Sequence, residues 1–180
     1  MADLPRFPRR KYIPATADRF DGGTDPTWSP DGDSILFGQP DARDDTTRHN
    51  VLRIFNLKSG RTSVVPGSEG LRSPRFSPDG RYISASSASD TKLMLLDVAR
   101  QTWTAQGPKH AGWQCWSKDS KYVYFPYFIR RPDVVPTIFR VAVHKNKPER
   151  ILSLKDFRLT GDFGASFSLH PTMIHWCCET

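Results

Sequence analysis

The sequence predicts an all-β fold in which a short unit is repeated about three times. The first observation is a turn motif, an aromatic residue followed by Ser-Pro-Asp-Gly, which occurs at 28–32 and 76–80 and more loosely from 116. The second is spacing: with a stub of a fourth copy at Phe167, the leading aromatic residues lie 48, 40 and 51 residues apart. Such a period is typical of folds built from stacked, similar units. The repeated residues are Trp28, Ser29, Pro30, Asp31, Gly32, Phe76, Ser77, Pro78, Asp79, Gly80, Trp116, Ser117 and Asp119.

Each copy of the motif has the composition of a tight turn between two strands. Ser, Pro, Asp and Gly suit a type I turn, because Pro presets its own φ and Gly accepts a left-handed conformation. An alternating apolar strand follows, as at Ile35 and Phe37. In the third copy Lys118 and Ser120 replace Pro and Gly, and we expect the same turn at a cost of about 1 kcal/mol. The leading aromatic residues are expected to be buried between neighbouring units.

Each unit is interpreted as four antiparallel strands, which is one blade of a β-propeller. We therefore predict a partial β-propeller with about three four-stranded antiparallel blades plus the start of a fourth. Residues 1–19 are interpreted as a leader or the remnant of a preceding element, and 171–180 as an atypical tail. The blades are expected at about 25–67, 73–107, 112–155 and, incomplete, 163–170, within a propeller region covering 20–170.

The amino-acid composition of the chain agrees with such a fold, and its charge and hydropathy bear on the function and localisation to expect. Fifteen Pro and twelve Gly among 180 residues favour one turn-rich β domain. The net charge of +7 is spread along the chain, with a basic run only at 9–11, which indicates a soluble basic surface more than nucleic-acid binding. The lack of a long apolar run predicts no transmembrane helix. The lack of a signal peptide indicates a cytoplasmic protein, or a periplasmic one if the chain belongs to a larger exported or anchored protein.

The sequence predicts a non-catalytic chain without a metal site or a cofactor. It contains no nucleophile elbow, His-Glu-x-x-His motif or phosphate loop. Asp31 and Asp79 are interpreted as turn formers and not as acid or base catalysts. Cys115, Cys177 and Cys178 lack the spacing of a zinc site or a disulfide framework, and Cys115 is expected to be a buried strand thiol.

The repeats resemble the TolB-type, WD40-like propeller repeat, also called PD40, whose signature is an aromatic residue, Ser-Pro-Asp-Gly and x-x-Ile-x-Phe. The segments 28–37 and 76–85 carry it closely, and 116–125 loosely. A narrower resemblance, at 138–141 and 150–158, is to propellers that follow a winged-helix DNA-binding domain in bacterial regulators. That resemblance implies DNA contact only through a winged-helix domain. The family usually has six blades, so a truncated or frame-shifted chain is our hypothesis.

The expected function is a non-catalytic binding or scaffolding module, the sensory or interaction part of a larger bacterial regulator. The alternative is the propeller domain of a prolyl-oligopeptidase-like hydrolase, or a periplasmic TolB-like protein. In either case the partner is expected to be a protein or a small ligand. Unpaired strands at the open ends of the blades also predict self-association.

The binding residues are expected on the longer loops, at the face opposite the tight turns. Loops on a rigid scaffold concentrate binding residues, and aromatic residues beside arginines are favoured in interfaces. The alternative is that these loops, 39–50 and 126–136, are tolerated insertions. The candidate partner-binding residues are Arg48, His49, Tyr127, Phe128, Arg130 and Arg131.

Overall fold

The chain folds into three four-stranded antiparallel sheets. The computed structural model describes residues 24–40, 50–89, 91–107, 109–127 and 134–155, and no helix occurs within these ranges. The first sheet contains β1 (Thr24–Trp28), β2 (Ser34–Pro40), β3 (Asn50–Asn56) and β4 (Arg61–Val64). The second contains β5 (Leu71–Phe76), β6 (Tyr82–Ser87), β7 (Leu93–Asp97) and β8 (Thr102–Gln106). The third contains β9 (Cys115–Trp116), β10 (Tyr122–Tyr127), β11 (Thr137–Ala142) and β12 (Glu149–Ser153).

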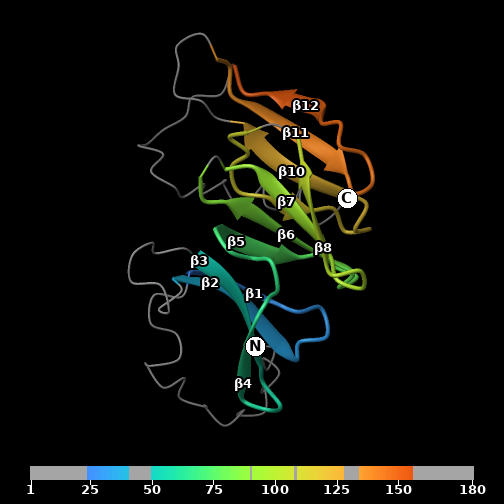
Figure 1. The fold of residues 1–180 in the computed structure, drawn as a ribbon. Coiled ribbons are helices and arrows are strands. Elements are labelled where there is room, and N and C mark those ends of the chain that lie inside the picture. Colours follow the sequence, from blue (N-terminus) through green and yellow to red (C-terminus); the bar gives the residue numbers. More distant parts are fainter. Residues whose placement is uncertain (1–23, 41–49, 90, 108, 128–133, 156–180) are drawn as a thin grey trace, which may run out of the picture.

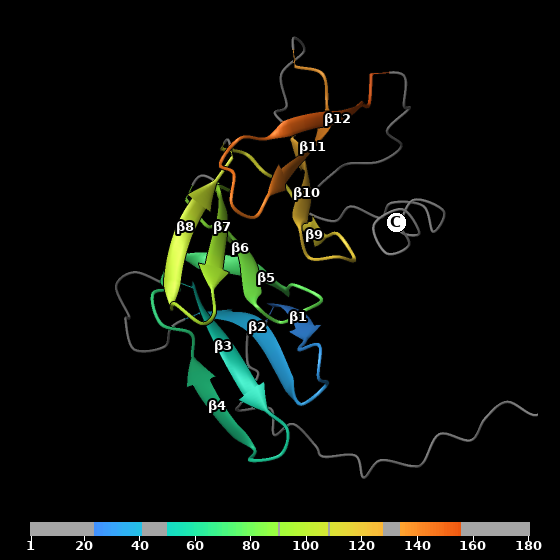
Figure 2. The same ribbon diagram turned by 90° about the vertical axis from the view of Figure 1, so that its right-hand side faces the viewer.

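Each sheet is a meander whose strands pair in sequence order. Figure 1 shows the sheets stacked in the order of the sequence, and Figure 2 shows them spread as a fan. The first strands, β1, β5 and β9, lie on the inner side of the fan, and the last strands, β4, β8 and β12, lie on the outer side. The predicted all-β class and the three four-stranded blades are confirmed. The stub of a fourth blade at Phe167 lies outside the described residues.

The predicted strands agree closely with the observed ones because tight turns mark their ends. The strand expected at 102–106 is β8, and those expected to begin at 34 and 61 begin there. The strand expected at 113–116 is shorter, since only Cys115 and Trp116 pair with β10. Cys115 lies in this inner strand and is half-buried, so the expectation of a fully buried thiol is wrong.

We call the three sheets blades one, two and three, in sequence order. An apolar core fills the space between each pair of neighbouring blades. Alternation along the strands sends every second side chain to one face. The core between blades one and two contains Leu36, Leu52, Val65, Leu71, Ile83, Ala85 and Leu96. The core between blades two and three contains Tyr82, Leu93, Leu95, Ala111, Trp116, Val123, Phe125, Val141 and Val143. Blade two is therefore buried on both faces, as a stacked repeat requires.

The leading aromatic residues of the second and third motifs, Phe76 and Trp116, pack against the preceding blade. Trp116 is 6% exposed. Its ring stacks on Tyr82 of blade two at 6.2 Å between centroids, and its Nε1 donates to the Arg75 carbonyl oxygen at 3.3 Å. Phe76 is partly buried and packs against the core shared with blade one, so its predicted burial is met only in part. Trp28 is 59% exposed, so the prediction that it is buried is wrong. The reason is that no blade precedes blade one among the described residues.

The motif serine is the centre of each turn. In the first copy the Ser29 hydroxyl donates to the Asp31 carboxylate and accepts a hydrogen bond from the Ser34 amide at 2.9 Å. The Asp33 amide also donates to Asp31, at 2.9 Å. The same three contacts recur around Ser77 and around Ser117. The carboxylates are therefore turn formers, as predicted, and the motif Ser-x-Asp is a structural unit.

The degenerate third turn keeps its shape through a contact with the second. Gly32 and Gly80 have φ of +72°, and Ser120 occupies the same conformation with φ of +60°. Its amide donates to the Ser117 carbonyl oxygen at 2.9 Å, as Gly32 and Gly80 do in their own turns. The Ser120 hydroxyl accepts a hydrogen bond from the Asp79 amide at 3.1 Å. This contact between blades offsets the strain of a left-handed serine.

Candidate functional site

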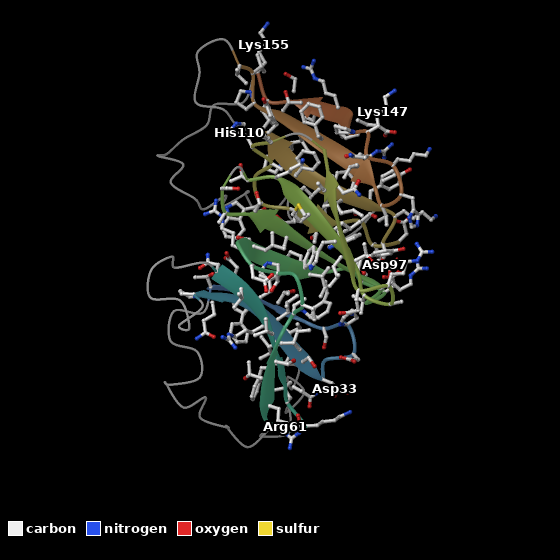
Figure 3. All side chains as sticks on the ribbon, in the orientation of Figure 1. Asp33, Arg61, Asp97, His110, Lys147 and Lys155 are labelled. Atoms are coloured by element: carbon white, nitrogen blue, oxygen red, sulfur yellow. The ribbon has the colours of Figure 1, made fainter. Side chains whose placement is uncertain are left out.

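The meander gives the molecule two faces of different construction. We call the face formed by the tight turns at 29–33, 57–60, 77–81, 98–101, 117–121 and 143–148 the turn face. The opposite face, where the second strand of each sheet ends and the third begins and where one sheet connects to the next, is the loop face. In Figure 3, Asp97 and Lys147 lie along one edge, the turn face, while His110 and Lys155 lie on the other side.

One of the predicted binding residues, Tyr127, is described, and it lies on the loop face. Tyr127 ends β10, where it pairs with Thr137 and forms a bridge with Ala111. Its ring contacts Phe139 edge to face at 6.0 Å, and Phe139 stacks on the buried Phe125. The base of the loop that follows is therefore anchored on the core between blades two and three. Arg48, His49, Phe128, Arg130 and Arg131 lie outside the described residues.

Sequence reasoning missed a row of polar contacts that joins the inner strands. The Ser73 hydroxyl of blade two donates to the Asp25 carboxylate of blade one at 2.8 Å. The Gln114 amide of blade three donates to the Ser73 carbonyl oxygen, and its own oxygen accepts from the Ser86 hydroxyl at 3.1 Å. Gln114 is 4% exposed, so these bonds satisfy a side chain that would otherwise be costly to bury. The row holds the three blades at fixed positions around the inner side of the fan.

Two of the inner strands, β1 and β5, also share a strained backbone position. Asp25 and Ser73 have φ of +54° and +53°, and each lies within an irregularity of strand pairing. Non-glycine residues in this region are strained and require support from their surroundings. A repeated Pro after each residue, Pro26 and Pro74, was the signal in the sequence that could have marked this position.

The partly buried Arg75 side chain lies between the inner strands. The Arg75 guanidinium donates to the carbonyl oxygens of Asp25 and Pro74 at 3.3 and 2.7 Å and lies 5.6 Å from the centre of the Trp113 ring. Burial lowers the pKa of Arg75, and the nearby Asp25 carboxylate opposes this change. The contacts span all three blades, which gives Arg75 a structural role at the centre of the molecule.

The turn carboxylates are shifted toward their charged form. The hydroxyl of Ser29 holds the pKa of Asp31 below its ordinary value, and the Ser117 hydroxyl does the same for Asp119. At Asp79, burial raises the pKa, but hydrogen bonds from Ser77 and Arg81 outweigh it and the net shift is downward. Each carboxylate is therefore stabilised as the acceptor that its turn needs.

Two further observations concern the described residues alone. They contain no group of three or more His, Cys, Asp or Glu side chains that could hold a metal ion. They also contain no helix that is long and apolar enough to cross a membrane.

The three-bladed arrangement was compared with known proteins. No family model matches the sequence, and no curated protein matches it. Among solved structures, the β-propeller domain of the Trilobed protease from Pyrococcus furiosus matches 73% of this chain and 41% of its own, with a TM-score of 0.57 and 20% identity. The three sheets are blades of a β-propeller.

Other similar structures agree with this assignment. TolB from Acinetobacter baumannii matches 71% of this chain with a TM-score of 0.54 and 21% identity, over 31% of its own length. The acylaminoacyl peptidase from Pyrococcus horikoshii matches 72% with a TM-score of 0.56 and 17% identity, over 24% of its length. The chain thus spans less than half the length of each of these propeller proteins. At these identities the likeness shows the fold alone.

Proposed function

We propose that these blades are a non-catalytic binding module, the propeller part of a TolB-like or prolyl-peptidase-like protein. The observation that carries the proposal is the stack of three meanders, which matches propellers of both classes over more than 70% of this chain. These classes are the alternative that the sequence already suggested. The narrower resemblance to winged-helix regulators remains a prediction that rests on two short segments.

The packing of the blades supports a role as a rigid support. Blade two is buried on both faces, and polar side chains such as Gln114 and Ser120 join neighbouring blades. The turn carboxylates Asp31, Asp79 and Asp119 are each engaged by a serine hydroxyl within their own turn. This leaves the loops as the natural place for contacts, because a rigid support lowers the entropy lost when its loops bind. The anchored Tyr127 lies at the base of one such loop.

Photo-crosslinking tests the binding role. A photoreactive phenylalanine analogue is introduced at Tyr127 on the loop face or, as the control, at the exposed Lys58 on the turn face. Crosslinking in the producing cells is expected to yield a discrete adduct from position 127 and none from position 58. Equal adducts from both positions, or none from 127, would contradict a loop-face binding role.

The protein class is tested independently by the coding sequence that flanks these blades. An α/β-hydrolase domain or further propeller blades would support the proposal. A winged-helix domain upstream would instead support the regulator hypothesis.

A further inference from the structure

Blades one and three each have a sheet face that none of the described blades covers. Leu36 of blade one lies in the core shared with blade two, so alternation places the neighbouring Ile35 and its cross-strand partner Trp28 on the opposite face. Val123 of blade three lies in the core shared with blade two, so Tyr122 lies on the opposite face. We call these surfaces the end faces, since Figure 2 shows blades one and three at the two ends of the fan.

The contact between blades two and three is the template for what the end faces can do. There Trp116 stacks on Tyr82 at 6.2 Å between ring centroids. Trp28 is equivalent to Trp116, because each pairs with the first apolar residue of the following strand. Tyr122 is equivalent to Tyr82, because the amide of each donates to its motif serine hydroxyl at 2.9 Å. One half of this contact therefore recurs on the end face of blade one, and the other half recurs on that of blade three.

Both halves have the chemistry of an aromatic contact. The Trp28 side chain is 59% exposed, and covering its indole would remove a large apolar surface from water. Tyr122 is half-buried, and the Arg140 guanidinium lies 4.3 Å from the centre of its ring. Arg140 Nε donates to Glu149 at 2.9 Å, which holds the guanidinium in place. Among aromatic rings, Trp interacts best with such a cation, so this end face suits an indole.

The turns beside these aromatic residues carry opposite charges at matching positions. Between blades one and two, Pro30 adjoins Gly80, since a Cβ added at Gly80 would lie 3.7 Å from Pro30 Cγ. Blade three has the exposed Lys118 at the position of Pro30, and blade one has Gly32 at the position of Gly80. The same packing between the end faces would therefore bring the Lys118 ammonium close to the Asp31 carboxylate, which precedes Gly32.

The contact uses the half of the end face of blade one that lies next to the turn face. Phe37 and Val51, farther along this face, are each 1% exposed and offer no surface. The available surface is Trp28 with its turn at 29–32. Such a contact joins sheet faces, whereas unpaired edge strands would join through their backbones.

We propose that the partner of these surfaces is a second copy of this chain, with Trp28 of one copy packed on Tyr122 and Arg140 of the other. The contact is heterologous, because it joins two different faces. Each copy in a pair keeps one end face free, so association continues beyond a dimer unless a ring closes. This interface does not involve the loop face and is independent of the proposed function.

Sedimentation velocity tests the proposal with the full chain and two variants. Trp28→Ser removes the half on blade one. Lys118→Asp combined with Tyr122→Ser removes the half on blade three, and Ser is the residue that blade one has at the position of Tyr122. Each variant alone is expected to be monomeric at concentrations at which the wild-type chain associates. An equimolar mixture is expected to form a heterodimer and nothing larger, because each variant contributes its intact face.

Two control variants separate this contact from general stickiness. Trp28→Phe keeps an aromatic ring and is expected to associate. Ile151→Asp places a charge on an apolar residue of the edge strand β12 that is 37% exposed, and is expected to associate like the wild-type chain. Loss of association in Ile151→Asp would place the contact at the strand edge and overturn the proposal. A monomeric wild-type chain, a monomeric mixture, or wild-type association by the Trp28→Ser variant or the double variant alone would overturn it as well.

A crosslink provides a readout that does not depend on how these variants fold. A photoreactive phenylalanine analogue is placed at position 28, and this chain is mixed with an isotope-labelled wild-type copy. Mass spectrometry is expected to find the adduct on the labelled peptide that contains Tyr122. An adduct on the labelled segment around Trp28 would show a symmetric contact and overturn the proposal, and so would the absence of any labelled adduct.

Discussion

Trp116 and Trp28 occupy the same position in two copies of the repeat. Replacing each of them by Ala separates the contribution that burial makes to the free energy of unfolding from the contribution of the motif position. Trp116 is 6% exposed and is stacked on Tyr82, whereas Trp28 is 59% exposed. Removing a buried Trp costs about 3–5 kcal/mol in free energy of unfolding. We expect Trp116→Ala to reach this range, because it also removes the donor to the Arg75 carbonyl oxygen. Trp28→Ala should cost about 1 kcal/mol or less.

Urea unfolding followed by circular dichroism measures both values. The free energy of unfolding is obtained by linear extrapolation, after checking that fluorescence gives the same transition. The wild-type chain and the conservative Trp116→Phe variant, which keeps the aromatic stack, serve as controls. Equal losses in Trp116→Ala and Trp28→Ala would refute the packing of each aromatic residue on the preceding blade. A loss below about 1 kcal/mol in Trp116→Ala would refute its burial.

Four other predictions follow from the turns and the open end. Gly80→Val should lower the free energy of unfolding by about 1–2 kcal/mol, because φ is +72° there, and Gly80→Asn should cost less when measured in urea. Ser120→Ala should cost about 1 kcal/mol through loss of its bond to the Asp79 amide, and a wild-type urea midpoint would argue against that bond. The contribution of the Asp119 carboxylate to stability should be complete above pH 3.8, the ordinary pKa of this group. It should be lost as the pH falls through the lowered pKa that Asp119 has in the folded chain. The Asp119→Asn variant should therefore show a smaller drop in urea midpoint between pH 6 and pH 3 than the wild-type chain. The isolated chain should self-associate, because Trp28 is exposed and the outer strands β4, β8 and β12 pair along one edge only in the described sheets. Trp28→Ser should reduce this in light scattering, and a monomeric wild-type chain would contradict it.

The sequence was sufficient for the fold because the signals of this fold are local. A Ser-Pro-Asp-Gly turn closes within four residues, and Gly32 and Gly80 take the conformation that the turn requires. The strand at 102–106 was correctly predicted for the same reason, since turns bound it on both sides. Trp28 was assigned wrongly because burial depends on a neighbouring blade, which the motif itself does not contain.

The contacts between blades could not be predicted because they join residues about one repeat apart. Gln114 and Ser73 form a bond across 41 positions, and nothing in a periodic pattern pairs them.

The central claim is that the three sheets stack as propeller blades, and proton–proton nuclear Overhauser effects test it most directly. Strand pairing within blade three is predicted to give contacts between Tyr124 and Arg140. Stacking of blades is predicted to give contacts between the Trp116 indole and the Tyr82 ring, which belong to neighbouring blades and lie 6.2 Å apart between centroids. Observation of both sets would confirm the stacked blades. Contacts within the sheet without any between Trp116 and Tyr82 would contradict them.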